Sequence, residues 1–389
     1  MTTAGARQPG MTGERYRERL AGTQLAVRNH GLRGLLIAVG PDLRYLTGYN
    51  AIPTERLTML VLPADGAPRL VVPRLEATPA RRSAAVDAGL LEVVTWGETD
   101  DPHRLVGSLL GEGHDVLLPL GVSDRLWAGH LLRLQDGLAQ AHFESATPVL
   151  RELRVIKDDD EIELLRIAAH AADRVVERIA SGHLVGRTES DVAHEVRDRL
   201  VAEGHDSADF AIVASGPNAA SPHHEASDRV IGVGEPIVLD IGGSLGGYCS
   251  DTTRTLWVTG GEPSRRPDDE FLRIFGLVRD AQAEATSAVR PGVPCERLDE
   301  IARSVIEGGG LGPQFIHRLG HGIGLEGHEE PYLVAGRSEP LQVGMAFSIE
   351  PGIYLEGRYG VRIEDIVVCG PDGPVVLNES PRDLRIVDG

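Results

Sequence analysis

The sequence predicts an α+β protein of two domains, and three observations support this. The chain has 389 residues, a length typical of two domains. Up to about residue 150, short apolar runs alternate with helical patterns, which is typical of a small α/β domain. A long amphipathic helix then begins, and from about residue 210 the chain is rich in strands. We therefore expect a disordered tail at 1–11, an N-terminal α/β domain at 12–152 and a larger domain at 153–389.

The elements expected in the N-terminal domain follow from its apolar runs and turn residues. Residues Ala64, Asp65 and Gly66 separate two apolar runs and favour the tight turn of a hairpin. Polar residues are scattered here, so nothing in this domain indicates a catalytic site. The expected elements are a helix at 12–30, a strand at 31–40, a hairpin at 58–73 and strands at 91–96 and 115–121.

The larger domain begins with helices whose first residues carry start signals. The acidic stretch Asp158 to Glu161 suits the positive end of a helix dipole. Thr188 is a candidate N-cap for a second helix at 189–203. Two further helical patterns, at 268–288 and 295–307, are separated by the breaker sequence RPGVP.

Composition excludes several classes of function. The formal charge is −19, from 39 basic and 58 acidic residues, which opposes binding to nucleic acid or to anionic membranes. No apolar run approaches the ~20 residues that span a bilayer, and the polar N-terminus does not have the pattern of a signal peptide. The three cysteines form no CxxC pattern, which favours the reducing cytoplasm over a disulfide framework.

The stretch Pro236–Thr255 predicts a hairpin that supplies two carboxylates. If Leu245 and Gly246 are the central turn residues, Asp240 lies opposite Asp251. Cross-strand Cβ atoms are then roughly 5 Å apart. Two buried carboxylates this close repel each other unless a cation lies between them. Two solvated aspartates flanking a turn are the alternative.

The segment HRLGHGIGLEGHEEP (317–331) brings three histidines, His317, His321 and His328. Its interleaved glycines disfavour a long helix, so we expect an extended segment that presents His321. The form GxGxxG occurs here without a preceding strand, and Pro331 follows where a helix would have to continue, so it does not indicate a dinucleotide site. HEEP is also not the HExxH motif of helical zinc sites.

A second hairpin is expected within AFSIEPGIYLEGRYGVRIEDIVVC (346–369), with PGIYLEGRYG as its loop. Glu350 and Glu364 are then delivered by apposed apolar strands, with Gly357 at the midpoint between them. A glutamate that points inward from such strands needs a counterion. The alternatives are that Glu350 caps a turn and that Glu364 and Asp365 form an exposed edge.

Together these segments predict a metal site that carries out hydrolysis. Carboxylates with one imidazole suit Mn²⁺, Co²⁺, Fe²⁺ or Zn²⁺. Four carboxylates carry a charge that two divalent ions neutralise and one does not. Two such ions hold a bridging water and convert it to a hydroxide nucleophile. Cys249 lies on the face of Asp251 and is either a soft ligand or a small buried thiol, the second being the favoured interpretation. No P-loop is present.

The motifs LDIGGSLGGYCSDTTRT, HRLGHGIGLEGHEEP, SIEPGIY and VRIED resemble those of the pita-bread metallopeptidases (family M24) in order and spacing. That family includes Xaa-Pro aminopeptidase, prolidase (Xaa-Pro dipeptidase) and methionine aminopeptidase. The resemblance covers about 150–389. The first 150 residues resemble, more weakly, the N-terminal domain of prolidase and creatinase. The resemblance implies a pita-bread catalytic domain after a smaller α/β domain.

The resemblance also implies a ligand set for two divalent ions, foremost Mn, with Co, Zn or Fe as alternatives. Asp251 and Glu364 are expected to bridge both ions, and Asp240 to complete the shell of one. His321 and Glu350 are expected to complete the other. Glu350 is further implied as the general base that takes a proton from the bridging water.

Roles in substrate binding and proton transfer follow from the same resemblance. His223, rather than the adjacent His224, is implied in substrate binding and proton transfer, and His328 in a hydrogen bond to the scissile carbonyl. The remaining implied contacts are His317 in the proline pocket, Arg362 against a ligand carboxylate, Tyr354 in the same network, and Arg337 as a candidate for the substrate carboxylate.

The leading hypothesis is a dinuclear exopeptidase that cleaves the Xaa-Pro bond of dipeptides, with the N-terminal domain of a second subunit closing the site. The alternatives are an Xaa-Pro aminopeptidase acting on longer peptides, a creatinase-like amidinohydrolase that works without metal, and an inactive peptide-binding module. The expected partner is a small peptide with proline after the scissile bond. We expect a homodimer or a larger homo-oligomer.

Overall fold

The computed structural model describes residues 11–110 and 118–388. The tail expected at 1–11 lies outside these residues except for Met11. The chain divides into two compact units between Arg154 and Val155, which are considered separately. None of the described helices is both long enough and apolar enough to cross a membrane.

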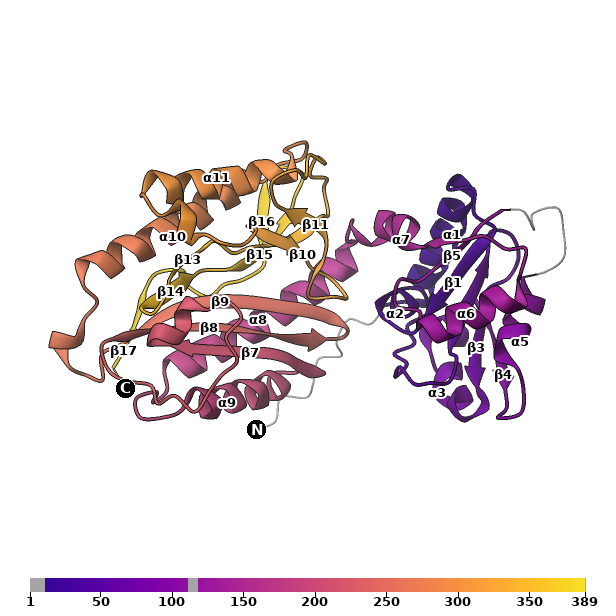
Figure 1. The fold of residues 1–389 in the computed structure, drawn as a ribbon, viewed down its shortest axis with the longest axis horizontal. Coiled ribbons are helices and arrows are strands. Elements are labelled where there is room, and N and C mark those ends of the chain that lie inside the picture. The colour runs from indigo at the N-terminus through magenta and orange to yellow at the C-terminus, as the bar shows by residue number, and fades with distance from the viewer. Residues whose placement is uncertain (1–10, 111–117, 389) are drawn as a thin grey trace. The chain divides into compact units, whose positions relative to one another are not determined.

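The smaller unit contains one mixed six-stranded sheet flanked by helices (Figure 1). Its strands, in spatial order, are β4 (Glu92–Trp96), β3 (Arg69–Pro73), β2 (Met59–Pro63), β1 (Gly34–Ala38), β5 (Leu120–Val122) and β6 (Phe143–Ser145). Its helices are α1 (Gly13–Asn29), α2 (Pro41–Thr47), α3 (Ala77–Arg81), α4 (Ala84–Asp87), α5 (Pro102–Leu109), α6 (Ala128–Gly137) and α7 (Thr147–Arg154).

Most elements expected in this unit are confirmed. Strands β2 and β3 pair in antiparallel about Asp65, as the hairpin at 58–73 requires. The strand expected at 115–121 is shifted, because β5 begins only at Leu120 and ends at Val122. Residues 115–117 of that prediction lie outside the described chain. Apolar side chains of β1 to β3 pack with those of α5 and α6 in one core, so burial explains the continuous apolar runs.

In the larger unit, strands lie between two pairs of helices (Figure 1). One sheet has the order β17 (Arg385–Val387), β9 (Tyr248–Val258), β8 (Glu235–Leu245), β7 (Ser207–Ser215), and α8 (Asp159–Ala180) and α9 (Glu189–Ala202) pack on it. The other has the order β11 (Glu329–Leu333), β10 (Gly320–Gly322), β12 (Ala346–Ile349), β15 (Asp365–Cys369), β16 (Pro374–Val376). Strands β13 (Gly352–Leu355) and β14 (Tyr359–Arg362) form a separate pair. Helices α10 (Asp269–Ser287) and α11 (Cys295–Gly308) share a core with these strands.

Helix starts in the larger unit follow the expected capping chemistry. Asp158 forms a capping box with Glu161 at the start of α8, because each residue's side chain accepts a bond from the other's backbone N–H. Thr188 does the same with Asp191 at the start of α9. The two predicted helices at 268–288 and 295–307 are α10 and α11.

The predicted register of the first hairpin is wrong. Gly246 and Gly247 both have positive φ, +60° and +94°, so they are the two turn residues. Leu245 therefore pairs with Tyr248, Asp240 with Thr253, and Asp251 with Gly242. Because the turn centre lies one residue later than predicted, every residue of the first strand pairs with a residue two positions later than predicted. Asp240 and Asp251 are diagonal neighbours on one face of the sheet rather than directly opposite each other.

The second hairpin is centred where expected, but its loop is shorter. Ile349 pairs with Asp365 and Gly352 with Arg362, so both strand pairs are symmetric about Gly357. The predicted loop PGIYLEGRYG is itself mostly a strand pair, because Ile353 and Val361 are fully buried in the core with α10 and α11. Glu350 and Glu364 lie where the ladder is interrupted between the two strand pairs.

Candidate metal centre

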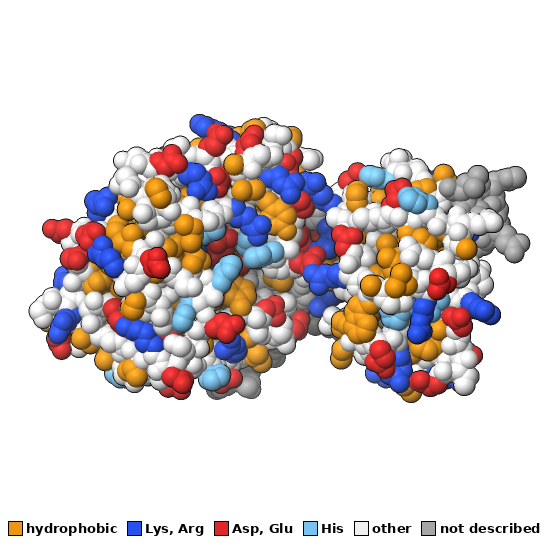
Figure 2. Space-filling model, in the orientation of Figure 1, with side chains coloured by type: hydrophobic (Ala, Val, Ile, Leu, Met, Phe, Trp, Pro, Cys, Tyr) orange, Lys and Arg blue, Asp and Glu red, His pale blue; other side chains and the backbone are white. Residues whose placement is uncertain are grey.

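The five side chains expected to bind metal are brought together in the larger unit. They form two overlapping groups, each with ligand atoms within 4.8 Å of one another: Asp240, Asp251 and Glu364, and His321, Glu350 and Glu364. A third group joins Asp251 and His321 to His328. On the face shown in Figure 2, histidine side chains border acidic ones near the middle of this unit.

His321 reaches the carboxylates from a short strand flanked by glycines. A Cβ atom at Gly320 would overlap the carbonyl oxygen of Ser348, and one at Gly322 would overlap that of Glu330. Glycine is therefore needed on both sides of the histidine. His321 Nδ1 lies 3.1 Å from the Gly322 carbonyl oxygen, which leaves Nε2 for the carboxylates. His321 Nε2 is 3.2 Å from Glu350 Oε1 and 3.7 Å from Asp251 Oδ2.

Arg362 and Thr253 link the two hairpins. The Arg362 guanidinium donates to Asp240 Oδ2 at 2.6 Å and to the Tyr354 hydroxyl at 2.7 Å. The Thr253 hydroxyl donates to Glu364 Oε2 at 2.6 Å. Asp240 and Glu364 thus each have one carboxylate oxygen that accepts a hydrogen bond from the protein. The other oxygens, Asp240 Oδ1 and Glu364 Oε1, are buried without a hydrogen-bond partner. Two such oxygens in one cluster suit a cation.

The local charges perturb the pKa values of the cluster in opposite directions. Burial, followed by repulsion from Glu364 and Asp240, raises the pKa of Asp251 well above its usual range. Burial and the charge of Glu350 raise the pKa of Glu364 in the same way. Burial would also raise the pKa of Glu350, but the hydrogen bond and charge of His321 outweigh it and lower this pKa to about 2. The cluster holds more negative charge than its neighbours compensate.

For Asp240, Asp251 and Glu364, burial excludes the alternatives to an inward-facing carboxylate. Glu364 and Asp365 do not form an exposed edge, since they are 1% and 0% exposed. Asp365 points to the opposite side and pairs with Arg254 Nη2 at 2.7 Å. Asp240 and Asp251 are likewise buried, so they are not solvated turn residues. Cys249 lies in none of the metal-binding groups among the described residues, and burial raises the pKa of its thiol to about 12. Both observations favour the interpretation of Cys249 as a small buried thiol rather than a metal ligand.

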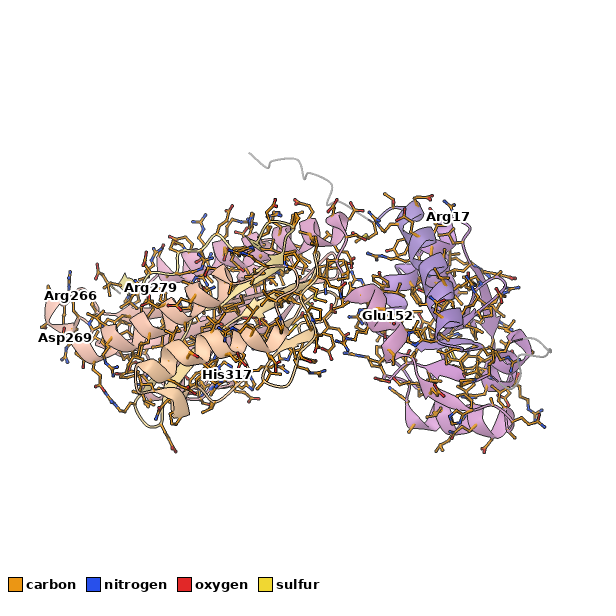
Figure 3. The ribbon with its side chains drawn as sticks, turned by 90° about the horizontal axis from the view of Figure 1, so that it is seen from above. Arg17, Glu152, Arg266, Asp269, Arg279 and His317 are labelled. Atoms are coloured by element: carbon orange, nitrogen blue, oxygen red, sulfur yellow. The ribbon has the colours of Figure 1, made fainter. Side chains whose placement is uncertain are left out.

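Two of the predicted histidines lie beside the cluster. The His328 ring centroid is 3.8 Å from that of His321, and Arg318 Nη2 is 3.4 Å from His328 Nδ1. Burial and the charge of His321 lower the pKa of His328 to about 4, so this imidazole is neutral at pH 7. His317, labelled in Figure 3, is hydrogen-bonded through Nε2 to the Tyr354 hydroxyl at 2.9 Å. Burial lowers the pKa of His317 as well.

His223 is exposed on a loop that a buried carboxylate anchors. Glu189 is fully buried at the start of α9 and accepts hydrogen bonds from the backbone and hydroxyl groups of Ser215 and Ser227. His224 Nε2 also lies 2.8 Å from Glu189 Oε2. His224 is therefore held by the scaffold, whereas no such contact holds its exposed neighbour His223 within the described chain.

Arg337 lies outside the cluster, and its charge is already compensated. Its guanidinium is 3.3 Å from Glu330 and 3.9 Å from Glu339. The side chain is 40% exposed.

Four residues that hold a side chain of the site, or the loop that carries His223, were missed from the sequence. One of them is Ser348, whose hydroxyl donates to Glu350 Oε1 at 3.0 Å. Thr253 and Ser348 lie two positions from Asp251 and Glu350, on the same strand faces, so period-2 alternation could have indicated them. Arg318 lies three residues before His321, and Glu189 directly follows the predicted N-cap Thr188. No local signal distinguishes these last two, because their partners are distant in sequence.

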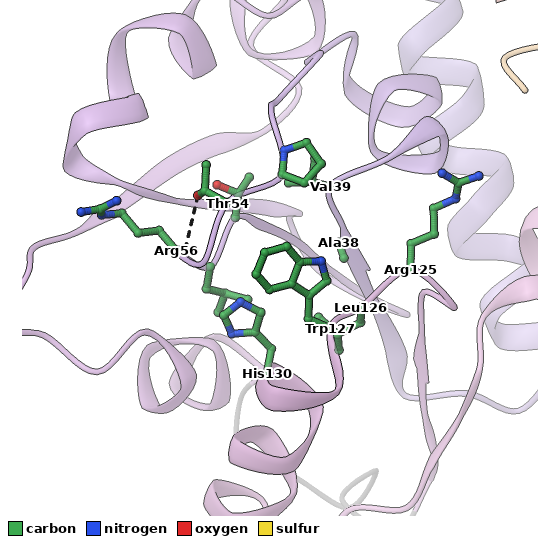
Figure 4. Close-up of a pocket in the computed structure, with 11 residues that line it drawn as sticks. Ala38, Val39, Thr54, Arg56, Arg125, Leu126, Trp127 and His130 are labelled. Carbon is green, nitrogen blue, oxygen red and sulfur yellow. Dashed lines mark hydrogen bonds between the residues drawn. The ribbon is translucent and has the colours of Figure 1, made fainter. Parts of the chain in front are cut away.

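The smaller unit has a pocket of about 430 Å³, which holds none of the metal-binding groups found among the described residues, and a second pocket that is too small for a peptide. Figure 4 shows Trp127 and His130 of this pocket near Arg56, whose backbone N–H donates to the Thr54 hydroxyl. The pocket volume is about 30 Å³, little more than one water molecule occupies. We locate the candidate site in the larger unit, because the metal-binding groups found among the described residues all lie there.

Two family models match the chain. The one described as Metallopeptidase family M24 matches residues 163–371, and the one described as Creatinase/Prolidase N-terminal domain matches residues 19–156. The two matches occur in the order that the sequence motifs predict.

Individual proteins match over nearly the whole chain. The probable dipeptidase PepE of Mycobacterium tuberculosis is 48% identical over 375 residues, which cover 96% of this chain and 97% of that protein. The crystal structure of dipeptidase PepE from Mycobacterium ulcerans has a TM-score of 0.89 at 45% identity, covering 97% of this chain and 99% of its own. Recombinant prolidase from Thermococcus sibiricus has a TM-score of 0.87 at 36% identity, covering 96% and 99%. These similarities confirm the predicted fold class, a pita-bread domain after a smaller α/β domain.

Proposed function

Since the chain belongs to metallopeptidase family M24 and is therefore a hydrolase, we propose that it is a metal-dependent dipeptidase that cleaves the Xaa-Pro bond. The names of its relatives, dipeptidase PepE and prolidase, support a dipeptide substrate. Proline after the scissile bond is the narrower part of the proposal and comes from the prolidases.

The buried carboxylate cluster is the observation that carries this proposal. Asp240, Asp251, Glu350 and Glu364 converge with Arg362 as the one guanidinium bonded to them among the described residues. Unpaired buried charges are strongly destabilising, so such a cluster requires further positive charge. The orphaned oxygens of Asp240 and Glu364 are suited to supply the remaining bonds to cations. The residues present therefore fit a divalent metal site.

We propose that this set holds two divalent ions, with Mn²⁺ foremost and Co²⁺, Zn²⁺ or Fe²⁺ as alternatives. Glu364 belongs to both of the three-residue groups that together contain the five expected ligands, and Asp251 is grouped with Asp240 as well as with His321, which supports a shared role for these two carboxylates. Asp240 then serves one ion, and His321 with Glu350 the other. When bound, the ions would polarise a water and the scissile carbonyl.

The side chains around the cluster support defined roles in the reaction. The Glu350 carboxylate lies within the cluster, 3.2 Å from His321 Nε2, and we propose that it takes a proton from the attacking water as general base. Arg318 can donate to His328 Nδ1, which places the proton of this neutral imidazole on Nε2. His328 can then donate a hydrogen bond to the scissile carbonyl oxygen. We propose that His223 assists proton transfer to the departing amine.

The second set of roles concerns substrate fit. We propose that His317 lines the proline pocket and that Tyr354 orients it, since the two side chains share a hydrogen bond. Arg362 acts through Asp240, whose carboxylate it holds in place.

The test is an assay of metal-reconstituted protein on four substrates. Ala-Pro should be hydrolysed with Mn²⁺ and not after chelation, and activity that survives chelation would contradict the metal mechanism. Cleavage of Ala-Pro-Ala without Ala-Pro would identify an aminopeptidase for longer peptides. Met-Ala-Ser and creatine test the methionine aminopeptidase and creatinase activities, and inactivity on all four would favour a binding module.

Two broader features are also proposed. The three cysteines are buried, and Cys249 and Cys369 are free thiols, which supports a reducing compartment such as the cytoplasm. We further expect a homodimer or larger homo-oligomer, which light scattering coupled to gel filtration measures.

A further inference from the structure

The chain contains one lysine, and it is buried. Of its 39 basic residues, 38 are arginines and only Lys157 is a lysine. Among the described residues, four of these basic side chains are buried, and the lysine is one of them; the other three are Arg19, Arg254 and Arg362. Arginine is thus the residue that this chain uses elsewhere for a positive charge. The one exception indicates a position that requires a compact ammonium group.

Lys157 forms an ion pair with Glu329 in the interior of the larger unit. Lys157 Nζ is 2.6 Å from Glu329 Oε1, and the two side chains are only 1% and 9% exposed. A Cβ atom at Gly324 would lie 2.6 Å from the same oxygen, so the loop after β10 packs directly against the carboxylate. Removing either partner of a pair this deeply buried leaves an uncompensated charge, which is strongly destabilising.

The backbone of Lys157 is fixed before α8 begins. Its N–H donates to the carbonyl oxygen of Gly344 at 2.9 Å, and Ile156 pairs with Met345 in an isolated antiparallel bridge. The next residue, Asp158, caps α8. The ammonium group therefore extends from a fixed base to the end of the loop that joins β10 to β11.

The ladder between β10 and β11 is irregular where this loop begins. The register shifts between His321 and Gly322, and Gly322 pairs with Glu329. After such a shift, the alternation of the strand no longer determines which way the next side chains face. The pair with Lys157 therefore fixes Glu329, and with it the residue before it, His328. The His328 ring centroid lies 3.8 Å from that of His321.

We propose that the Lys157–Glu329 pair positions His328 beside the metal centre, and that a lysine is required for this. The proposal rests on the proposed function, in which His328 donates to the scissile carbonyl oxygen. Lys157 is then a positioning residue, because it acts through Glu329 and the loop. An arginine does not fit, since its larger, planar guanidinium would have to enter a site that leaves 1% of the lysine side chain exposed.

Three variants test the pair in the metal-reconstituted protein. Lys157→Met, Lys157→Arg and Glu329→Gln should each lower kcat on Ala-Pro by about 10- to 100-fold, because a displaced donor no longer meets the charge that develops on the carbonyl oxygen. KM and the affinity for Mn²⁺ should stay within about 3-fold of wild type. Glu270→Gln breaks the exposed pair with Arg358 and is the control, with wild-type kcat expected. Wild-type kcat in Lys157→Met and Glu329→Gln would overturn the proposal, and wild-type kcat in Lys157→Arg would overturn the requirement for a lysine.

Double variants separate positioning from general damage to the fold. Lys157→Met combined with His328→Ala should be no slower than His328→Ala alone, since the pair acts through this histidine. Losses that add would show a purely structural role and overturn the proposal. Lys157→Met combined with Glu329→Met leaves no unpaired charge, so it should fold even if the single variants do not. It should still lose kcat by about 10- to 100-fold, and wild-type kcat in this protein would also overturn the proposal.

Two measurements on the full chain with metal bound need no activity. Because Lys157 is the only lysine, its acetylation by an amine-reactive ester, mapped by mass spectrometry, reports on opening of the pair. Glu329→Gln should speed this acetylation at least about 10-fold, and Lys157→Met should speed hydrogen exchange of residues 323–328 by a similar factor. Wild-type rates in both variants would overturn the proposal. If His328→Ala leaves kcat unchanged, the proposed role of His328 fails, whereas these rates still decide whether the pair holds the loop.

Discussion

The two hairpins that supply the carboxylates position them in different ways. Strands β8 and β9 form an uninterrupted antiparallel ladder from Glu235 to Val258, and both aspartates lie within it. The second hairpin is interrupted, and both glutamates lie in the gap between its two strand pairs. A continuous ladder fixes side chains by alternation, whereas a gap leaves tertiary contacts to orient them.

Neighbouring residues show what the interruption achieves. Glu364 faces the metal centre and is held by Thr253, while Asp365, the next residue, faces Arg254 and Gln282. Two adjacent buried carboxylates thus have separate partners on opposite sides. The first hairpin therefore acts as the frame, and its Thr253 fixes a ligand of the second. Four predictions test this division, in order of decreasing effect.

Removing a carboxylate that is proposed to serve both ions should have the largest effect. Asp251→Asn should abolish tight metal binding and lower activity by at least about 1,000-fold, because the charge that holds the metal is lost. Calorimetry with Mn²⁺ and an assay on Ala-Pro measure this. Asp209→Asn, an exposed carboxylate on β7, is the control and should retain both. An active, metal-loaded Asp251→Asn protein would contradict the proposal that Asp251 serves both ions.

Without metal, the same substitution should stabilise the fold in a pH-dependent way. The raised pKa of Asp251 means that the folded state keeps its proton while the unfolded state, with a pKa near 3.9, loses it. Wild type therefore loses stability relative to Asp251→Asn as pH rises above about 4, by up to about 1.4 kcal/mol per pH unit until the folded pKa is passed. Urea unfolding in chelator at several pH values measures the difference. If the difference in unfolding free energy between the two proteins does not change with pH, charge repulsion within the carboxylate cluster does not destabilise the folded state.

Breaking the bond between the hairpins should have a moderate effect. Thr253→Val preserves shape but removes the hydrogen bond to Glu364 and the contact with Arg362. Metal affinity should fall by about 10-fold, as is typical when a partner of a ligand is removed. Thr259→Val, near the end of β9, removes hydrogen bonds to Val387 and Asp388 and should leave metal affinity unchanged. Equal metal affinities of wild type, Thr253→Val and Thr259→Val would mean that the second hairpin orients Glu364 without help from the first.

The turns should show the smallest effects. Gly246→Ala and Gly357→Ala both place a Cβ at positive φ, +60° and +71°, and each should destabilise by about 1 kcal/mol. Gly246→Ala should cost more, because its Cβ also meets Leu164 at 3.2 Å, whereas Gly357 has open space. Thermal unfolding measures both. Gly357→Asn should be nearly neutral, since asparagine tolerates this conformation.

Much of the fold followed from local signals. Apolar periodicity and caps predicted α1, α9, α10 and α11 and the start of α8 to within a few residues, because these signals act within one or two turns of helix. Hairpin β2–β3 and the centre of the second hairpin at Gly357 followed from glycine placement. The shifted strand β5 shows the limit, since an apolar run does not say where pairing begins.

By itself, the sequence indicated which residues form the candidate metal centre: apolar runs and a glycine-flanked segment pointed to carboxylates and a histidine, and the family resemblance implied the set of two aspartates, two glutamates and one histidine. Only the tertiary structure decided how they are held. The choice between Leu245–Gly246 and Gly246–Gly247 as the turn depends on backbone conformation and moved the partner of Asp240 from Asp251 to Thr253. The contacts Arg362–Asp240, Thr253–Glu364 and Arg318–His328 depend on packing, which local preferences do not encode. Of these three, the first two join hairpins more than 100 residues apart in the chain, where no periodicity reaches.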